Sequence, residues 1–224
     1  MTTLLHIDAS ARTDRSLSRH LSGLFVESWR AKRPQDCVIR RDLGAAPPPF
    51  VTQDWIAACF TPPEQRSASM QEALAWSDTA LDELEAASLI VIGAPMYNYG
   101  LPSALKGWLD QVIRIGRSFS FDLARGDWPI EPIMSGKRLV VLSARGEFGF
   151  TAGGVREGLN HFDPHLATCA RYLGVARDAI HSVTIEYQEF GGARHERSRA
   201  EAEAHTVALA TELARSAQGK AAVA

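Results

Sequence analysis

Five short apolar runs, separated by longer segments of mixed polarity, set the pattern of this chain. They cover residues 4–7, 37–39, 89–92, 138–143 and 179–185. The run at 89–92, Leu-Ile-Val-Ile, is apolar at every position and rich in β-branched residues, which is typical of a parallel strand covered on both faces. Short strands that alternate with helical segments, without an internal repeat, predict one α/β domain over residues 1–224 with a parallel sheet.

The segments between these runs carry apolar residues at helical spacing. The clearest case begins at Pro102, because the first turn of a helix tolerates proline. Leu105, Trp108, Leu109 and Val112 then recur on one face. We expect further helices over residues 17–33, 64–87, 164–173 and 200–214, and a shorter helical patch at 54–60.

Two long connections lack this spacing, at residues 44–63 and 122–136. Long connections in compact domains are often binding loops or oligomer contacts. In the second connection Trp128 stands among prolines and acidic residues. Trp128 has two interpretations: an aromatic ring folded onto the surface, or a wall of a substrate pocket that reaches across a dimer.

Composition and charge narrow the class of protein. The 224 residues are 46% hydrophobic and 22% charged, as in a soluble globular protein with a sizeable core. A net charge of −2, from 24 basic and 26 acidic residues, argues against a nucleic-acid surface and against the strong acidity of a small electron carrier. No apolar segment reaches the ~18 residues of a membrane span and no basic leader precedes the first run, so we expect neither a span nor a signal peptide.

Cysteine and histidine spacing predicts neither disulfides nor a metal site. Cys37, Cys59 and Cys169 show no CxxC pattern, and we expect them to be reduced thiols in a cytoplasmic protein. His161 and His165 are four apart, but no third histidine, cysteine or glutamate completes a ligand pattern around them. We therefore expect no bound metal.

A serine-rich loop follows the first apolar run. Residues 8–18, DASARTDRSLS, bring several hydroxyls and the free N–H groups of a helix start together, with Ser10, Ser16 and Ser18 among them. This combination suits an anion such as a phosphate monoester. Taken alone, the loop is better explained as a serine N-cap with a solvated approach. The loop lacks GxxxxGK[ST] and GxGxxG, which weighs against a nucleotide hydrolase or an ordinary dinucleotide fold.

The third apolar run leads into an aromatic turn at residues 94–101, and the fourth into a glycine-containing loop at 143–154. In the first of these loops Tyr97 and Tyr99 stand where packing does not require them. Ligands of open α/β sheets bind at the carboxyl ends of the strands. The loops after the first, third and fourth runs are therefore the candidate binding loops.

The sequence around the aromatic turn resembles one known family. Its matching motifs are Pro95-Met96-Tyr97-Asn98-Tyr99, Pro102-Ser103-x-Leu105-Lys106-x-Trp108-Leu109-Asp110 and Arg114-x-Gly116-x-Ser118-Phe119. This run resembles the signature of the FMN-dependent NADH azoreductases, also called FMN-dependent NADH:quinone oxidoreductases. The resemblance implies a flavodoxin-like fold with five parallel strands in the order 2-1-3-4-5, helices on both faces, and a homodimer with its active sites at the interface.

The resemblance also implies the site residues. Asn98 would lie near the flavin N5 edge, and the group that binds FMN would comprise Ser10, Ser16, Leu17, Ser18, Pro95, Met96, Tyr97, Asn98, Tyr99, Ser143, Ala144, Arg145 and Gly146. Phe121, Trp128 and Tyr172 would line the substrate pocket. The chain departs from the family pattern at Phe121, where many relatives have tyrosine, and at Glu147, where the family usually has glycine.

As a function, the resemblance implies hydride transfer from NADH or NADPH to flavin N5 and then to a quinone or azo compound, in a ping-pong, two-electron exchange. No GxSxG, Cys–His or paired-carboxylate motif indicates another chemistry. Two alternatives remain: a flavodoxin-type electron carrier and, less favoured, a phosphodiesterase-type hydrolase. The choice between NADH and NADPH and the physiological acceptor stay open.

Overall fold

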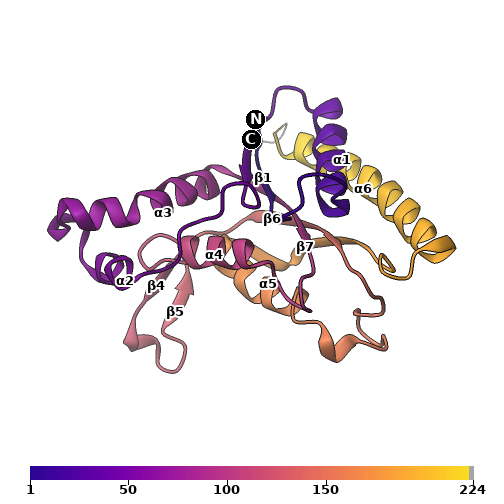
Figure 1. The fold of residues 1–224 in the computed structure, drawn as a ribbon. Coiled ribbons are helices and arrows are strands. Elements are labelled where there is room, and N and C mark those ends of the chain that lie inside the picture. Colours follow the sequence, from indigo (N-terminus) through magenta and orange to yellow (C-terminus); the bar gives the residue numbers. More distant parts are fainter. Residues whose placement is uncertain (222–224) are drawn as a thin grey trace.

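The computed structural model describes residues 1–221 and has a five-stranded parallel sheet at its centre (Figure 1). The strand order is β2-β1-β3-β6-β7, which is the predicted order 2-1-3-4-5 in another numbering. The flavodoxin-like prediction is therefore confirmed. The bounds are β1 Thr3–Asp8, β2 Cys37–Asp42, β3 Leu89–Pro95, β6 Lys137–Ala144 and β7 Val175–Ile185.

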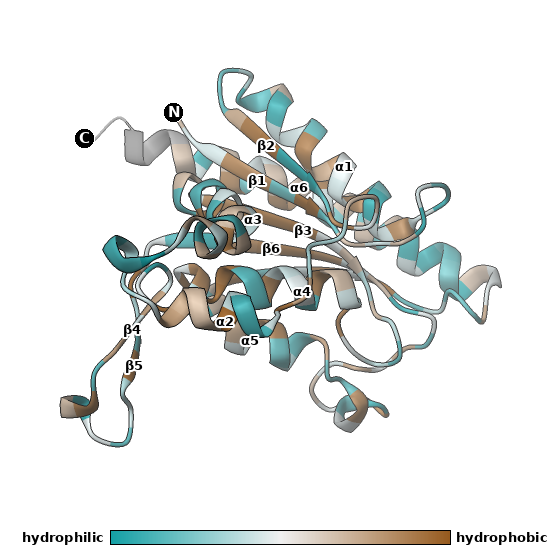
Figure 2. Cartoon of the chain, turned by 60° about the vertical axis from the view of Figure 1, so that its left-hand side comes forward, coloured by the Kyte–Doolittle hydropathy of each residue, from teal (hydrophilic) through white to brown (hydrophobic). Residues whose placement is uncertain are grey.

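Helices cover both faces of this sheet. Their bounds are α1 Leu17–Lys32, α2 Gln53–Phe60, α3 Ala68–Ala86, α4 Ser103–Val112, α5 Asp163–Ala170 and α6 Gly192–Ala221. Side chains of α1 and α6 pack on one face, and those of α3, α4 and α5 pack on the other. The inner strands β3 and β6 are largely hydrophobic (Figure 2), whereas β2 at one edge carries polar residues in its second half. This double cover explains why β3 is apolar at every position.

Hydroxyl side chains begin several helices by accepting the N–H of the residue three positions on. Ser16 caps α1 in this way, Thr52 caps α2 and Ser67 caps α3. The helix expected from residue 64 therefore begins at Ala68, since Pro63–Gln65 forms a separate 3-10 turn. Helix α6 begins eight residues before the expected 200, because its first two turns are polar and show no apolar spacing.

A two-stranded hairpin interrupts the region that the sequence indicates as an irregular connection. Strands β4 (Phe119–Phe121) and β5 (Ile130–Pro132) pair antiparallel, and the hairpin projects away from the central sheet (Figures 1 and 2). Strands of three residues are too short to show a reliable alternation in sequence. The hairpin carries Trp128, whose side chain is 79% exposed.

None of the helices within residues 1–221 combines the length and the hydrophobicity that a crossing of the bilayer requires.

Candidate functional site

Loops after β1, β3 and β6, with a fourth after β7, meet at the carboxyl edge of the sheet and line a cavity of about 250 Å³. The strand register places the carboxyl ends of β1, β3 and β6 side by side, because Asp8 pairs with Gly93 and Ala94 pairs with Ser143. The backbone N–H of Met96 also donates to the carbonyl of Ala144 at 2.9 Å. The cavity is lined by Ser10, Arg12, Arg15, Ser16, Leu17, Ser18, Pro95, Met96, Tyr97, Ala144, Gly146, Gln188 and Glu189. Most of the predicted cofactor-binding residues therefore share one cavity.

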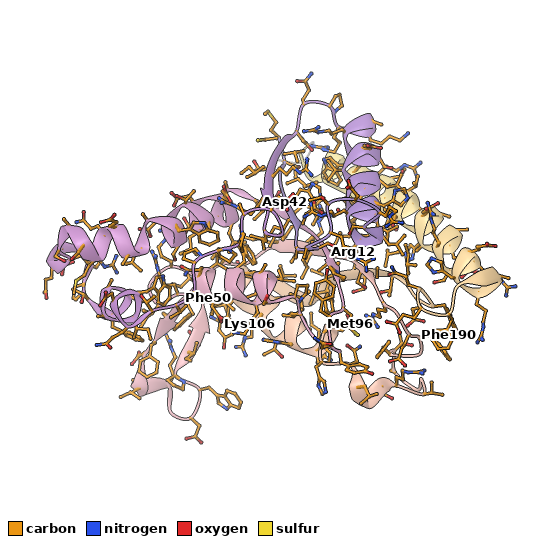
Figure 3. All side chains as sticks on the ribbon, viewed as in Figure 1. Arg12, Asp42, Phe50, Met96, Lys106 and Phe190 are labelled. Atoms are coloured by element: carbon orange, nitrogen blue, oxygen red, sulfur yellow. The ribbon has the colours of Figure 1, made fainter. Side chains whose placement is uncertain are left out.

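One end of the cavity is rich in hydroxyls and positive charge. Ser10 and Ser18 are buried, and the Oγ atoms of Ser16 and Ser18 lie 3.4 Å apart at the N-terminus of α1. Arg12 and Arg15, from the same loop, also line the cavity; Figure 3 shows Arg12 on the side of the loop toward Met96. Hydroxyls, helix N–H groups and two guanidinium groups form a donor set that suits a phosphate.

Arg19 of α1 fixes the serine loop from behind. Its Nη2 donates to the carbonyl of Ser10 at 2.7 Å, and its guanidinium also pairs with both carboxylate oxygens of Asp42. The hydrogen bond from Arg19 holds the pKa of Asp42 below its usual value, against the opposing effect of burial. The Ser10 backbone is thus positioned by a charged network of Arg19 and Asp42.

Asp8, at the end of β1, belongs to the same network. Burial alone would raise its pKa, but the His6 ring, whose Nε2 lies 3.4 Å from Asp8, and a hydrogen bond from Ser22 outweigh burial and lower it. The Ser22 hydroxyl donates to Asp8 at 2.7 Å. The carboxylate is therefore held in its ionised form beneath the loop.

The aromatic loop is a tight two-residue turn. Tyr97 and Gly100 exchange backbone hydrogen bonds of 3.1 and 2.9 Å, and both central residues, Asn98 and Tyr99, have positive φ angles of 46° and 66°. This is the type I′ hairpin geometry, which residues other than glycine and asparagine adopt only at a cost. Tyr97 lines the cavity, whereas Asn98 and Tyr99 lie exposed at the tip of the turn.

Alternation along β6 sends neighbouring side chains in opposite directions. Ala144 and Gly146 line the cavity, but the Ser143 hydroxyl lies 2.8 Å from the hydroxyl of Thr184 on β7. The Arg145 side chain also points elsewhere, and its Nη2 donates to Asp163 at 2.6 Å. Ser143 and Arg145 therefore border the site through their backbone, and their binding roles stay predictions.

Glu147, the acidic departure from the family pattern, lies beside the aromatic turn. Its carboxylate accepts a hydrogen bond from Arg156 Nε at 2.9 Å. The same carboxylate raises the pKa of the Tyr99 phenol above its ordinary value. Glu147 therefore keeps Tyr99 neutral over a wider pH range.

The loop after β7 supplies two cavity residues that the motifs do not indicate, Gln188 and Glu189. The Glu189 N–H donates to the Gly146 carbonyl at 3.0 Å. A Cβ at position 146 would stand 2.6 Å from Glu189 Oε1, so a larger residue there would displace the Glu189 side chain. Only the position of this loop in the sequence could have indicated it, because it follows the carboxyl end of a parallel strand, where ligands of such sheets bind.

The predicted substrate-pocket residues do not join this cavity within one chain. Phe121 and Trp128 lie exposed on the β4–β5 hairpin. The ring of Tyr172 packs edge-on against Phe119, with centroids 5.9 Å apart. None of the three lines the cavity, so their pocket role stays a prediction.

These residues fit the FMN that the resemblance implies. The serine and arginine end matches a phosphate, and Gly146 admits close approach to the backbone. The cavity volume of about 250 Å³ lies just below the ~300–1,000 Å³ of pockets that enclose a whole ligand. The chain alone would therefore leave part of an FMN outside its own cavity.

Comparison with known proteins agrees with this geometry. A family model described as a flavodoxin-like fold matches residues 2–209. The FMN-dependent NADH:quinone oxidoreductase 2 of Idiomarina loihiensis is 50% identical over 220 residues, which are 95% of this chain and 91% of that protein. The FMN-dependent NAD(P)H:quinone oxidoreductase 1 of Pseudomonas aeruginosa is 43% identical over 211 residues, covering 94% and 99% of the two chains.

Solved structures agree on the fold. An azoreductase from Bacillus anthracis strain Sterne superposes with a TM-score of 0.83 at 22% identity, covering 95% of this chain and 100% of that one. An FMN-dependent NADH-azoreductase from Bacillus anthracis strain Ames Ancestor, solved in complex with FMN, gives 0.82 at 18% identity, with coverage of 96% and 100%. The chain therefore belongs to the flavodoxin-like family and, within it, to the FMN-dependent NADH:quinone oxidoreductases, as the aromatic-loop motifs predict.

Proposed function

We propose that this protein is an FMN-dependent oxidoreductase that uses NADH or NADPH to reduce quinones and azo compounds. The observation that carries the proposal is the cavity at the sheet edge, where the serine loop, the aromatic turn and the end of β6 converge. Family membership supplies the cofactor and the reaction class. Bound in this cavity, FMN would supply two-electron hydride chemistry between the reductant and the acceptor.

The chain's own residues bind and orient the cofactor. We assign the FMN phosphate to the hydroxyls of Ser10, Ser16 and Ser18 and to the guanidinium groups of Arg12 and Arg15. The N-terminus of α1 adds the favourable end of a helix dipole. Arg19, which donates to the Ser10 carbonyl at 2.7 Å, positions this loop from outside the cavity.

The aromatic turn would face the reactive part of the flavin. The backbone N–H of Asn98 makes no hydrogen bond to another residue in the described part of the chain. We assign it as a donor toward flavin N5. A donor held in a strained turn needs no rearrangement when charge develops on its partner. Tyr97 and Tyr99 would then flank a flat apolar slot, which predicts loose selectivity for planar acceptors.

A second copy of the chain would complete the site. Phe121 and Trp128 are exposed on a hairpin that projects from the body (Figure 1), and neither contacts the cavity of its own chain. We propose a homodimer in which this hairpin closes the partner's site, with both reductant and acceptor using the same slot in turn. A ping-pong exchange follows from a shared slot.

An absorbance spectrum, recorded anaerobically before and after NADH and then after menadione or methyl red, tests the proposal. We expect flavin bands that bleach with NADH and return with the acceptor, which separates the two half-reactions. A protein that stays colourless after FMN is supplied would refute the cofactor assignment. A flavin that bleaches but is reoxidised by neither acceptor would favour an electron carrier.

A further inference from the structure

A second cavity, of about 700 Å³, lies beside the edge strand β7. The end of β7, the first half of α6 and the connection after β6 form its walls. Arg145 contributes its side chain to this cavity, while its neighbours Ala144 and Gly146 line the proposed flavin site. No residue assigned to the flavin through its side chain faces the second cavity, so it is a separate site.

Arg145 is a buried cation with hydrogen-bonding capacity to spare. It is 2% exposed, and Asp163 accepts only from its Nη2. Neither Nε nor Nη1 has a hydrogen-bond partner among the described residues. The Phe150 ring lies 5.4 Å from the guanidinium carbon and covers it. Buried charged donors are rarely left unpaired in folded proteins, so an acceptor is expected in this cavity.

Arg194, on the first turns of α6, is held by aromatic rings instead of a carboxylate. Its guanidinium carbon lies 5.8, 5.3 and 5.9 Å from the ring centroids of Phe148, Tyr187 and Phe190. Phe148 and Tyr187 are themselves stacked, with centroids 4.4 Å apart. Figure 3 shows Phe190 on the side of the molecule where α6 begins. The rings fix the position of the guanidinium and leave its donors uncommitted.

Carboxylates also line the cavity, and two of the three are already engaged. Asp163 accepts from Arg145 and from Asn160, and a Glu186 oxygen accepts from the Gly149 N–H at 3.1 Å. Glu201 lines the cavity from the same helix as Arg194 and Arg197. The uncommitted groups are therefore mainly arginine donors, together with serine and threonine hydroxyls.

We propose that this second cavity binds a small molecule through an oxyanion, a carboxylate or a phosphate group, held by Arg145 at its floor and Arg194 at its rim. Planar guanidinium groups recognise such oxygens by paired hydrogen bonds. The site does not depend on the flavin assignment, because none of its donors contributes to the serine loop. Two sources carry this chemistry: a free small anion, or a nucleotide phosphate.

The test follows the Arg145 Nε–H resonance by NMR while sodium acetate, inorganic phosphate or 5′-AMP is added at constant ionic strength. The serine loop can also bind oxyanions, so total binding is not the readout. The resonance is assigned by its loss in Arg145→Lys. We expect a saturable shift, and at least roughly tenfold weaker binding in Arg194→Met, since a charge-assisted hydrogen bond is lost.

Arg199→Met is the matched control. Arg199 is exposed on the same helix, pairs with Glu203 at 2.8 Å and does not line the cavity. Its removal lowers the local positive charge equally and should leave the binding unchanged. If 5′-AMP binds at least about tenfold more tightly than phosphate, a nucleotide is the source; if acetate and phosphate bind comparably to it, a free anion is.

Two results would overturn the proposal. One is an Arg145 resonance that none of the three anions shifts saturably, which would mean that solvent alone satisfies the guanidinium. The other is an equal loss of affinity in Arg194→Met and Arg199→Met, which would reduce the effect to net charge. The Arg145 resonance can also be assigned through its bonds to the Arg145 backbone in the wild-type protein, so a poorly folded Arg145→Lys does not prevent the test. The affinity comparison then needs only wild-type protein and surface variants of α6.

Discussion

Gly44 packs against Ser10 so closely that a Cβ at position 44 would stand 2.0 Å from the Ser10 carbonyl oxygen. The same Cβ would lie 2.6 Å from Nη2 of Arg19, the group that donates to that carbonyl. The segment after β2 thus packs against the serine loop and limits where its backbone can lie. Its glycine is required by space and not by backbone angle.

We therefore expect Gly44→Ala to displace the Ser10 carbonyl from Arg19. The variant should lose about 1–3 kcal/mol of unfolding free energy, as overpacked sites do, and should bind FMN at least roughly tenfold less tightly. Urea unfolding and fluorescence titration with FMN measure the two effects. Gly23→Ala is the control, because nothing lies within 4 Å of a Cβ there and alanine favours the α1 interior by about 1 kcal/mol. Unchanged FMN affinity in Gly44→Ala would contradict the idea that the packing of Gly44 positions the serine loop.

The serine loop makes a prediction specific to the phosphate. Ser18 is buried at the start of α1, with its Oγ 3.4 Å from that of Ser16. Ser18→Ala should weaken FMN binding by about tenfold to a hundredfold, because one charge-assisted hydrogen bond to the phosphate is lost.

Riboflavin, which lacks the phosphate, is the matched ligand for this comparison. Its affinity should change by less than about twofold in Ser18→Ala, since its ring and ribityl chain make their other contacts as before. Parallel losses for FMN and riboflavin would mean that Ser18 shapes the whole cavity and does not contact the phosphate.

The fold was predictable because its determinants are local. Each buried strand is an apolar run bounded by polar residues, and Pro102 marks a helix start that the structure places one residue later, at Ser103. The hairpin was not predictable in this way. Its three-residue strands pair through contacts such as Phe121 with Ile130, and the eight residues between them do not form the two-residue turn pattern that marks a hairpin in sequence.

The site was predictable only as far as its motifs reach. The three motif-bearing loops do converge, but Gln188 and Glu189 come from a loop with no recognisable pattern. Side-chain direction was also beyond the motifs, since Ser143 and Arg145 turn toward β7 and Asp163. Alternation along a strand could have indicated that Ala144 and Arg145 face opposite ways.

Asp42 makes the unfolding free energy of the protein depend on pH in the acidic range. Its pKa is lowered in the folded protein, chiefly by the hydrogen bond from Arg19, so its contribution is complete above the unfolded value of ~3.9 and is lost as pH falls through the lower folded value. Asp42→Asn should cost about 1–3 kcal/mol at neutral pH and should flatten the fall of unfolding free energy below about pH 4.

Denaturant unfolding at several pH values measures this effect. Asp127→Asn is the control, because Asp127 is exposed on the hairpin tip and should change stability by less than ~0.5 kcal/mol at any pH. An Asp42→Asn variant with the same acid slope as the wild type would show that other carboxylates, such as Asp8, dominate the transition.

Trp128 tests whether a second chain completes the site. The ring is 79% exposed on the hairpin, yet the proposal places it over the flavin of a partner. Removing a ring that packs against the acceptor should raise the KM for menadione by about tenfold in Trp128→Ala. The flavin content should not change, and the unfolding free energy should stay within ~0.5 kcal/mol of the wild type, because the ring packs on little of its own chain.

Leu123→Ala separates the ring from the hairpin, since Leu123 is 74% exposed on the same hairpin. This variant should keep a KM near the wild-type value if the Trp128 ring itself contacts the acceptor. Equal increases in both variants would assign the effect to the hairpin as a whole. Sedimentation analysis decides the premise, because a monomer that turns over menadione at the full rate leaves no partner site for Trp128 to close.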